Sequence, residues 1–217
     1  MKFVVIGVDG KMGKEIKKAA VKNGDFVIAG VDVKEKIDEN VYLSLDEIHR
    51  SFDAVIDFST APSREKFVKY CHMYNIPYGC FATNLTEHDM NLLKALSKKV
   101  PVLICSNASK GVNVMNKIVN NIAEDVSDSD VVLTEYHHKQ KIDSPSGTAR
   151  NLLQILLNNK IEAKVVAHRV GTENGKHILE FFWDNESLTI IHQANSKEIF
   201  AKRAIELMHK LISKENS

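Results

Sequence analysis

Apolar positions in the first hundred residues of this chain follow two alternating patterns. Stretches with apolar residues three or four positions apart have the spacing of helices with one buried face. Short apolar runs between them predict strands, at residues 2–7, 26–31, 53–58, 76–81 and 100–106. Strands and helices in alternation predict an α/β fold, here a Rossmann-like doubly wound parallel sheet. Such sheets bind ligands at the carboxyl ends of their strands.

The pattern changes after Asn107. A helical stripe at residues 114–126 is followed by a strand, and a second helix precedes three strand-like runs without intervening helices. Clustered strands of this kind predict a second, α+β domain on a mixed, largely open sheet. A last amphipathic helix is expected to pack back on the first domain. The predicted elements after the stripe lie at residues 131–136, 144–159, 163–170, 177–183, 187–194 and 198–212.

Composition and charge exclude several functions. The formal net charge is +1, with lysines interspersed among acidic residues, so nucleic acid and anionic membranes are not expected partners. No apolar run approaches the roughly 20 residues that span a bilayer, and the chain enters a strand at once, leaving no room for a signal peptide. Three scattered cysteines predict reduced thiols in a cytoplasmic protein, with no metal site: Cys71, Cys80 and Cys105.

Most of the candidate catalytic side chains lie in residues 135–149. Ser144 is a candidate N-cap and Pro145 suits the first helical position, so a helix is expected to begin here. Its first turn leaves backbone N–H groups free, and the helix dipole favours an anion there. Gly147 has no Cβ to keep a ligand from the backbone. Imidazoles and a cation beside this helix end indicate an active site for a small carboxylate; they are His137, His138 and Lys141.

Each of these residues also has a simpler interpretation. Adjacent histidines on a strand point to opposite sides, so His137 and His138 face one ligand only if the chain bends between them. Lys141 alone would be a solvated lysine, and Arg169 and His177 could simply pair with acidic neighbours. We interpret His168 and His192, which have no distinguishing context, as structural.

A glycine-rich turn follows the first predicted strand, at residues 7–13. Glycines there allow positive φ and close approach of a pyrophosphate to backbone N–H groups. Asp32 closes the second strand, where an acidic side chain can accept hydrogen bonds from an adenosine ribose. No arginine follows to hold a 2′-phosphate, although Lys34 supplies some charge, so the pattern favours NADH over NADPH.

Together these stretches resemble the 4-hydroxy-tetrahydrodipicolinate reductases, or dihydrodipicolinate reductases, of bacterial lysine and diaminopimelate synthesis. The resemblance runs from Lys2 to about Ala204. Its most specific part is the family string Glu-x-His-His-x-x-Lys-x-Asp-x-Pro-Ser-Gly-Thr-Ala, which residues 135–149 match at every fixed position. Further family motifs match at residues 7–13, 55–59, 107–114 and 169–177.

The resemblance implies reduction of a small cyclic dicarboxylate by NADH or NADPH, in a homotetramer assembled through the sheet of the second domain. It makes His137 the acid/base, Lys141 a proton donor, His138 a contact to one substrate carboxylate, and Gly147 and Thr148 the pair that holds the other. Residues 1–108, completed by the C-terminal helix 195–217, become the dinucleotide-binding domain, and residues 109–194 the substrate-binding and oligomerisation domain. The implied cofactor contacts are Gly7, Val8, Asp9, Gly10, Lys11, Met12, Asp32, Phe81, Ala82, Thr83, Cys105, Ser106, Asn107 and Ala108.

Some positions depart from the family pattern. Phe81 to Asn84 stands where the family carries Gly-Thr-Thr-Gly, and Phe81 adds bulk beside the cofactor unless it turns away. Ala108 replaces a phenylalanine, so an aromatic contact could have moved between the two loops. Lys110 replaces an apolar residue and Arg203 a glycine. Two alternatives therefore stay open: a catalytically weak metabolite-binding homologue, and a nicotinamide oxidoreductase for another small carboxylate.

Overall fold

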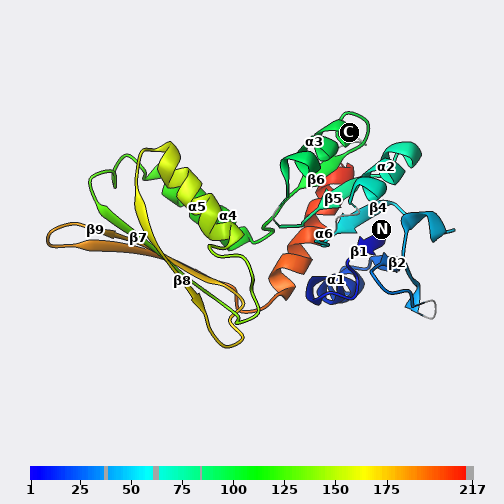
Figure 1. Cartoon of the computed structure of the whole chain (residues 1–217), viewed down its shortest axis with the longest axis horizontal. Coiled ribbons are helices and arrows are strands. Elements are labelled where there is room, and N and C mark those ends of the chain that lie inside the picture. The colour runs from blue at the N-terminus through cyan, green and yellow to red at the C-terminus, as the bar shows by residue number, and fades with distance from the viewer. Residues whose placement is uncertain (37–38, 61–63, 84, 214–217) are drawn as a thin grey trace. The chain divides into compact units, whose positions relative to one another are not determined.

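The computed structural model describes residues 1–36, 39–60, 64–83 and 85–213. Asn84 and residues 214–217, to which the expectations above extended, lie outside the described part. The chain divides into two compact units (Figure 1). Unit 1 comprises residues 1–108 with the C-terminal segment from Glu198, and unit 2 comprises Ser109–Lys197.

Unit 1 contains a six-stranded parallel sheet in the order β3-β2-β1-β4-β5-β6. The α/β prediction of a Rossmann-like sheet is therefore confirmed. Its strands are β1 (Lys2–Ile6), β2 (Phe26–Val31), β3 (Val41–Tyr42), β4 (Ala54–Asp57), β5 (Tyr78–Cys80) and β6 (Val102–Ile104). Its helices are α1 (Lys11–Lys22), the 3-10 turn η2 (Leu45–Glu47), α2 (Arg64–Tyr74), α3 (Glu87–Leu96) and α6 (Glu198–Ser213).

Two apolar layers hold this sheet, because successive strand residues point to opposite faces. On β1, Val4 and Ile6 join one buried cluster with residues of α2 and α3. Phe3 and Val5 join the other, with residues of α1 and α6. Helix α6 thus belongs to the core of unit 1, although 89 residues of unit 2 separate it from the rest. Within the described ranges, strand β3 and the 3-10 turn η2 were not predicted, because runs of two or three residues have no periodicity.

Unit 2 contains a four-stranded mixed sheet in the order β10-β9-β7-β8. Strand β7 pairs parallel with β8 and antiparallel with β9, and β9 pairs antiparallel with β10. This arrangement confirms the expected mixed sheet. The elements are α4 (Lys110–Asn121), β7 (Asp130–His137), α5 (Gly147–Asn158), β8 (Ala163–Arg169), β9 (Lys176–Phe182) and β10 (Ser187–Gln193).

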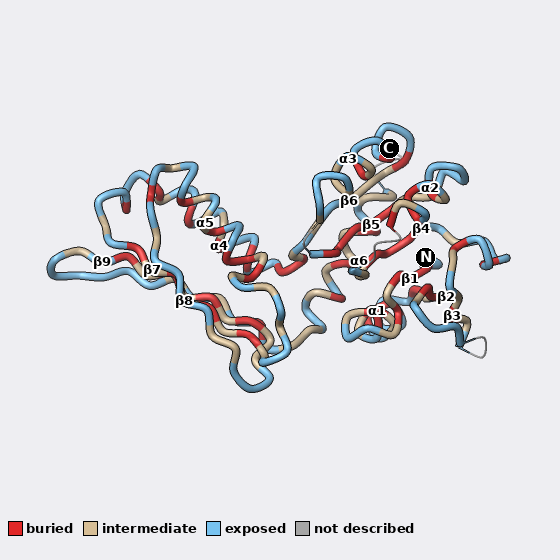
Figure 2. The backbone as a smooth tube through the Cα atoms, viewed as in Figure 1, coloured by how far each residue is buried: buried red, intermediate tan, exposed pale blue. Residues whose placement is uncertain are grey.

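Helices α4 and α5 cover one face of this sheet. Buried residues alternate with more exposed ones along β7 and β9 (Figure 2). The buried set, including Leu133, Leu179 and Phe181, packs against Met115 and Leu152 of the helices. The alternate residues lie on a face that neither α4 nor α5 covers.

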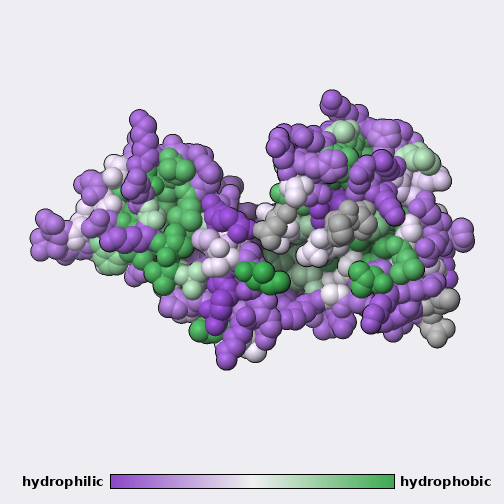
Figure 3. All heavy atoms as spheres, in the orientation of Figure 1, coloured by the Kyte–Doolittle hydropathy of each residue, from purple (hydrophilic) through white to green (hydrophobic). Residues whose placement is uncertain are grey.

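The predicted helical stripe at residues 114–126 was partly wrong. Helix α4 begins at Lys110, and the residues it buries are Val112, Met115 and Val119. Val114 and Ile118 are 46% and 41% exposed. With Leu157 of α5 they are among the exposed apolar residues of this unit, and Figure 3 shows apolar side chains gathered over α4 and α5. The apolar stripe of α4 is therefore wider than the part of the helix surface that the sheet can bury.

Candidate active site

Strand β7 places the first members of the site. Its alternation puts Glu135 and His137 on the face that the helices cover, in line with the buried Leu133. His137 is the last residue of the strand, and His138 follows outside it. The chain therefore leaves the sheet between the two imidazoles, which removes the objection that adjacent strand residues must point apart.

The carboxylate of Glu135 is fully buried and contacts groups from four elements. Its Oε1 accepts hydrogen bonds from the backbone N–H of Ser146 at 2.9 Å and from Nη2 of Arg169 at 3.1 Å. Its Oε2 lies 3.5 Å from Nδ1 of His137 and 3.6 Å from Nε2 of His177. Burial raises the pKa of this carboxyl, but its favourable interactions with His177, Ser146 and Arg169 outweigh burial and hold the pKa well below its usual range.

His137 is neutral near pH 7 in this ligand-free arrangement. Burial disfavours the imidazolium, and the attraction of Glu135 does not compensate for burial together with the repulsion of His177, Lys141 and Arg169, so the pKa of His137 falls to about 4. The His177 ring lies edge-on to it, 5.2 Å between centroids. Gly175 approaches the Nε2 edge of the ring: a Cβ at Gly175 would lie 3.1 Å from Nε2 of His137.

Helix α5 begins against this cluster. Its N-cap is Ser146, whose Oγ accepts from the N–H of Ala149 at 3.2 Å and lies 3.1 Å from Nε2 of His177. The prediction of Ser144 as N-cap was therefore wrong. The Ser146 backbone is anchored by Glu135, so the extended cap conformation falls there and the helix starts two residues later. Gly147 and Thr148 open the helix, where an anion-binding turn is expected.

The segment between β7 and α5 carries paired charges. Nζ of Lys141 lies 2.6 Å from Oδ1 of Asp143. Arg150 lies 3.7 Å from the other oxygen of that carboxylate. Nη2 of Arg169 also donates to the carbonyl of Asp143, so this segment is tied to Glu135 through one guanidinium. Lys141 is therefore held near the helix start by a carboxylate that can release it to an anionic ligand.

The glycine-rich turn has the geometry of a dinucleotide loop. Gly7 has φ +77°, and its N–H donates to the carbonyl of Val31. Gly10 is the N-cap of α1, and Lys11 and Met12 form the first turn of that helix. A Cβ at Gly13 would lie 2.4 Å from the carbonyl oxygens of Gly7 and Val8, so only glycine allows this close packing. Val8 is fully buried, and only its backbone remains for a cofactor.

Asp32 stands at the carboxyl end of β2, directly beside this turn. Its Oδ2 accepts from the N–H of Asp9 at 2.8 Å, and its Oδ1 accepts from that of Val33. The Asp9 side chain is paired with Lys36 at 2.8 Å. A small hollow of about 180 Å³ opens here, and its walls are Ile6, Gly7, Val31, Asp32, Val33, Leu43, Ser59 and Phe67. An apolar hollow with one carboxylate fits an adenosine.

The loops after β5 and β6 supply the remaining predicted contacts. Phe81 is 3% exposed, and its ring stacks on Phe58 at 5.0 Å. Phe81 has therefore turned into the core. Ala82 and Ala108 are also buried, and Ala108 belongs to the same apolar cluster as Phe81. The exposed or half-exposed positions in these loops are Thr83, Cys105, Ser106 and Asn107.

The family motif at residues 55–59, at the end of β4, is held by a buried hydrogen-bond network. Asp57 is fully buried, and its Oδ2 accepts from Nε of Arg64 at 3.0 Å and from the Tyr78 hydroxyl at 2.7 Å. Its Oδ1 accepts from the N–H of Ser59 at 2.7 Å. Asp89 takes the other side of the guanidinium at 2.8 Å. This network holds Ser59 beside Gly7, whose Cβ position is 3.3 Å from the Ser59 backbone.

Glu135, His137 and His177 also have the side-chain types of a metal site. Their candidate ligand atoms lie within 4.8 Å of one another. A cation there would face the guanidinium of Arg169, which already lies 3.1 Å from the same carboxylate. The guanidinium therefore disfavours a metal ion at this cluster.

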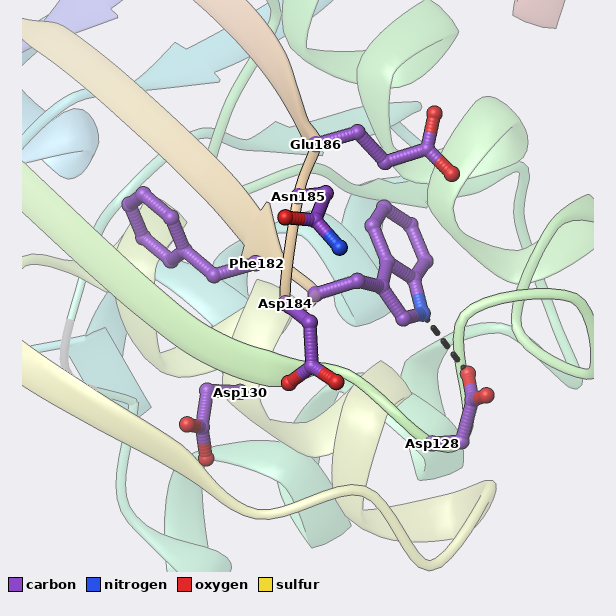
Figure 4. Close-up of a pocket in the computed structure, with 7 residues that line it drawn as sticks. Asp128, Asp130, Phe182, Asp184, Asn185 and Glu186 are labelled. Carbon is purple, nitrogen blue, oxygen red and sulfur yellow. Dashed lines mark hydrogen bonds between the residues drawn. The ribbon is translucent and has the colours of Figure 1, made fainter.

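A second hollow lies at the opposite end of β7 from His137 (Figure 4). The indole N–H of Trp183 donates to Asp128 across it at 2.8 Å. Its walls are Asp128, Asp130, Phe182, Trp183, Asp184, Asn185 and Glu186, none of them basic. Four carboxylates without a basic neighbour in that lining do not suit an anionic ligand.

Five residues at the candidate site were not predicted to form it: Glu135, Ser146, Arg169, Gly175 and His177. Glu135 could have been found, because it lies two residues before His137 on a strand and must share its face. Ser146 was placed inside the helix instead of at its cap. Arg169 and His177 were weighed only as partners of acidic neighbours, and both do face Glu135. The contact of Gly175 with His137 has no signal in the sequence.

The sheet order, the glycine turn and the acidic residue ending β2 define the class of dinucleotide-dependent oxidoreductases with a separate α+β unit. Two family profiles cover nearly the whole chain: "Dihydrodipicolinate reductase, N-terminus" over residues 1–108 and "Dihydrodipicolinate reductase, C-terminus" over residues 111–217. The chain belongs to the dihydrodipicolinate reductase family.

Curated relatives agree. The chain is 34% identical to the 4-hydroxy-tetrahydrodipicolinate reductase of Thermosipho africanus, covering 100% of this chain and 94% of that protein. It is 32% identical to the enzyme of the same name from Caldanaerobacter subterraneus, covering 99% and 94%. The dipicolinate-bound dihydrodipicolinate reductase from Paenisporosarcina sp. TG-14 has the same fold, with a TM-score of 0.77 at 19% identity over 98% of this chain and 95% of that one.

Proposed function

We propose that this protein reduces 4-hydroxy-tetrahydrodipicolinate to tetrahydrodipicolinate with a nicotinamide cofactor and with loss of water, in lysine and diaminopimelate biosynthesis. One observation carries the proposal. The imidazole cluster at the end of β7 and the first turn of α5 share direct hydrogen bonds, through Glu135 and Ser146. A proton donor and an anion-binding helix end therefore lie side by side, as reduction of an unsaturated dicarboxylate requires.

The residues of unit 1 fit the cofactor. The turn between Gly7 and the N-terminus of α1 would bind the pyrophosphate, and the hollow beside Asp32 would bind the adenosine. Phe81 is turned into the core, so the bulk expected to obstruct the nicotinamide is absent from the surface. When bound, the cofactor supplies a hydride. The exposed backbone of the loops after β5 and β6 is left to contact it, at Thr83 and Ser106.

Unit 2 would bind the substrate and provide the proton. The N-terminal turn of α5, at Gly147 and Thr148, binds one carboxylate through backbone N–H groups and the helix dipole. His138 and Lys141 bind the other carboxylate or the charge that develops on the ring. His137 becomes the imidazolium when the dianion enters, and it then donates its proton as the ring is reduced. The ammonium group of Lys141 would leave its ion pair with Asp143 and pair with the ligand instead.

A coupled assay tests the proposal. The purified protein is mixed with NADH or NADPH and the product of the preceding synthase reaction, and the loss of nicotinamide absorbance is followed. We expect turnover with at least one cofactor, and a loss of about 10²-fold or more in His137→Gln, the scale of general acid catalysis. Failure of the folded wild-type protein with both cofactors would contradict the proposal.

Asp32 should favour NADH, because a 2′-phosphate would be placed against its carboxylate and no arginine follows. We expect Asp32→Ala to weaken NADH more than NADPH. The Kd of each cofactor, measured by fluorescence, checks this. Because Asp32 also orders Asp9, some loss with both cofactors is expected. An equal loss with both would remove Asp32 from ribose recognition.

The assembly we propose is a homotetramer formed through the sheet of unit 2. The face that α4 and α5 leave uncovered carries apolar side chains, among them Val166 and Ile191, which are 42% and 58% exposed. A cytoplasmic location completes the proposal, supported by three unpaired cysteines. No helix in the described ranges is long and apolar enough to cross a membrane.

A further inference from the structure

Glu135 has no role in the reaction as proposed so far, yet its carboxylate lies where the proton donor meets the substrate-binding helix. We infer that Glu135 is a positioning residue. It holds the His137 imidazole in one orientation and one tautomer, and it fixes that ring relative to the first turn of α5. The inference rests on the proposed function for its catalytic consequence, but the geometry that supports it is independent of any substrate.

One carboxylate oxygen is directed at the proton donor. Oε2 of Glu135 lies 3.5 Å from Nδ1 of His137, and within the described residues neither atom has another hydrogen-bond partner. This separation is at the outer edge of a hydrogen bond, and such contacts commonly shorten when the complex forms. A proton on Nδ1 satisfies both atoms. It leaves Nε2, the nitrogen next to Gly175, as the site that gains and releases the reacting proton.

The other oxygen is held in place. Oε1 accepts from the backbone N–H of Ser146, the cap of α5, and from Arg169. Arg169 also donates to the carbonyl of Asp143, beside Lys141 in the connecting segment. The carboxylate cannot rotate without breaking these bonds. A shift of the helix cap or of the connecting segment would therefore also shift the partner of His137.

His177 supports the same arrangement without competing for it. Its Nε2 is closer to Oγ of Ser146, at 3.1 Å, than to Oε2 of Glu135, at 3.6 Å. Its ring lies edge-on to His137. His177 therefore limits the rotation of the His137 ring, while Glu135 determines which nitrogen carries the resident proton.

Charge supports this assignment. The groups that face His137 are Glu135 on its own strand, Arg169 on β8, His177 on β9 and Lys141 in the connecting segment. Glu135 alone among them favours the imidazolium, and its own pKa is low enough to keep it ionised throughout the working range. Removing its charge should lower the pKa of His137 further.

The test compares Glu135→Gln and Glu135→Asp with Glu162→Gln, an exposed glutamate of the same unit. Glutamine keeps an acceptor for Ser146 and Arg169 but loses the charge. We expect kcat in Glu135→Gln to fall by about tenfold to a hundredfold with KM little changed, the scale of a misplaced proton donor. The alkaline limb of its pH profile should move to lower pH. Aspartate should restore part of the rate, and Glu162→Gln should match wild type.

A second measurement does not need activity. In protein labelled with ¹³C at histidine Cε1, the His137 signal, assigned with His137→Gln, reports tautomer and pKa. We expect Glu135→Gln to lower that pKa and to mix the two neutral tautomers. An unchanged signal together with an unmoved pH profile would overturn the inference. If wild type shows no turnover at all, the proposed function fails, and the histidine signal alone decides whether Glu135 positions His137.

Discussion

His137 combines a buried position with a neutral resting state, and this determines when it can act. Its pKa of about 4 in the ligand-free protein means that almost no imidazolium is present near neutrality. The proposed substrate is a dianion, and two negative charges nearby favour the protonated ring. The proton needed for the reaction would therefore arrive together with the substrate and would be stored at the site where it is consumed.

This linkage can be measured with dipicolinate as the ligand. The pKa of His137 is low in the free protein and higher in the complex, so association takes up a proton between the two values. We expect affinity to rise by up to about tenfold per pH unit as the pH falls from about 8 to about 6. Calorimetry in two buffers of different ionisation enthalpy counts the protons. His137→Gln should abolish most of the uptake; the same uptake in that variant would assign the proton to another group.

At the residue scale, the proposed catalytic residues were easier to propose from the sequence than the residues that surround them. The spacing of His137, Lys141 and Gly147 follows from one continuous segment, so a single string identifies all three. Arg169 ends β8 and Gly175 lies in the turn before β9, and only strand pairing brings them to the end of β7. The sequence holds their identities, but the register that places Arg169 opposite His137 is a tertiary fact.

At the scale of elements, the turn before β9 shows how a backbone shapes a catalytic side chain. Gly175 has φ +135°, which L side chains rarely adopt, and its Cβ position lies 3.1 Å from Nε2 of His137. Gly171, in the connection between β8 and β9, also has positive φ, but a Cβ there would meet nothing within 4 Å. Substitutions at the two glycines can therefore be compared to separate the effect of backbone strain from the effect of contact with the His137 imidazole.

We therefore expect Gly175→Ala to lower both stability and turnover, while Gly171→Ala affects stability only. Strain of this kind costs about 1–3 kcal/mol at each position, and more at the less accessible φ of Gly175. Thermal denaturation gives the stability loss, and kcat at a temperature where both variants are folded gives the rest. Equal kcat in the two folded variants would show that the His137 contact is dispensable.

The loops after β5 and β6 illustrate a compensating exchange. Phe81 stands where the resembled family carries glycine, and Ala108 where it carries phenylalanine; both belong to one buried cluster. Relative to the family pattern, the large side chain lies in the first loop instead of the second, within one buried cluster. The sequence indicated that the exchange could occur, but the inward direction of Phe81 depends on packing against Phe58.

A double-mutant cycle tests this exchange. Phe81→Gly removes a buried aromatic ring and should destabilise unit 1 by about 3–5 kcal/mol. Ala108→Phe alone should also destabilise, through overpacking of about 1–3 kcal/mol. In the double variant the second change should recover part of the first loss, measured by urea denaturation. Strictly additive losses would show that the two sites do not share one space.

At the scale of the whole molecule, element order was largely predictable and the surfaces were not. The longer strands and helices can be predicted because each has its own periodicity of apolar residues. The positions buried on both faces of the sheet of unit 1 follow from the alternation of side chains along each strand. What covers a face depends on other elements or other chains. The stripe of α4 is apolar at Val114 and Ile118 although the chain leaves them exposed.

The uncovered face of the sheet in unit 2 carries the last prediction. Residues on this face alternate with the buried ones and include Thr134 of β7, Val166 of β8, Ile178 of β9 and Ile191 of β10. Exposed apolar side chains on an uncovered sheet face favour association with another copy. A lysine at its most exposed apolar position would place a charge in the middle of the assembled interface, where it lacks a partner.

We expect wild type to sediment as a tetramer and Ile191→Lys to sediment as smaller species. Ile118→Lys is the matched control, because it adds the same charge to an exposed apolar residue of the same unit on helix α4. Analytical ultracentrifugation over a range of concentrations measures both. If association is lost in Ile118→Lys and kept in Ile191→Lys, the helical surface, and not the open sheet, joins the subunits.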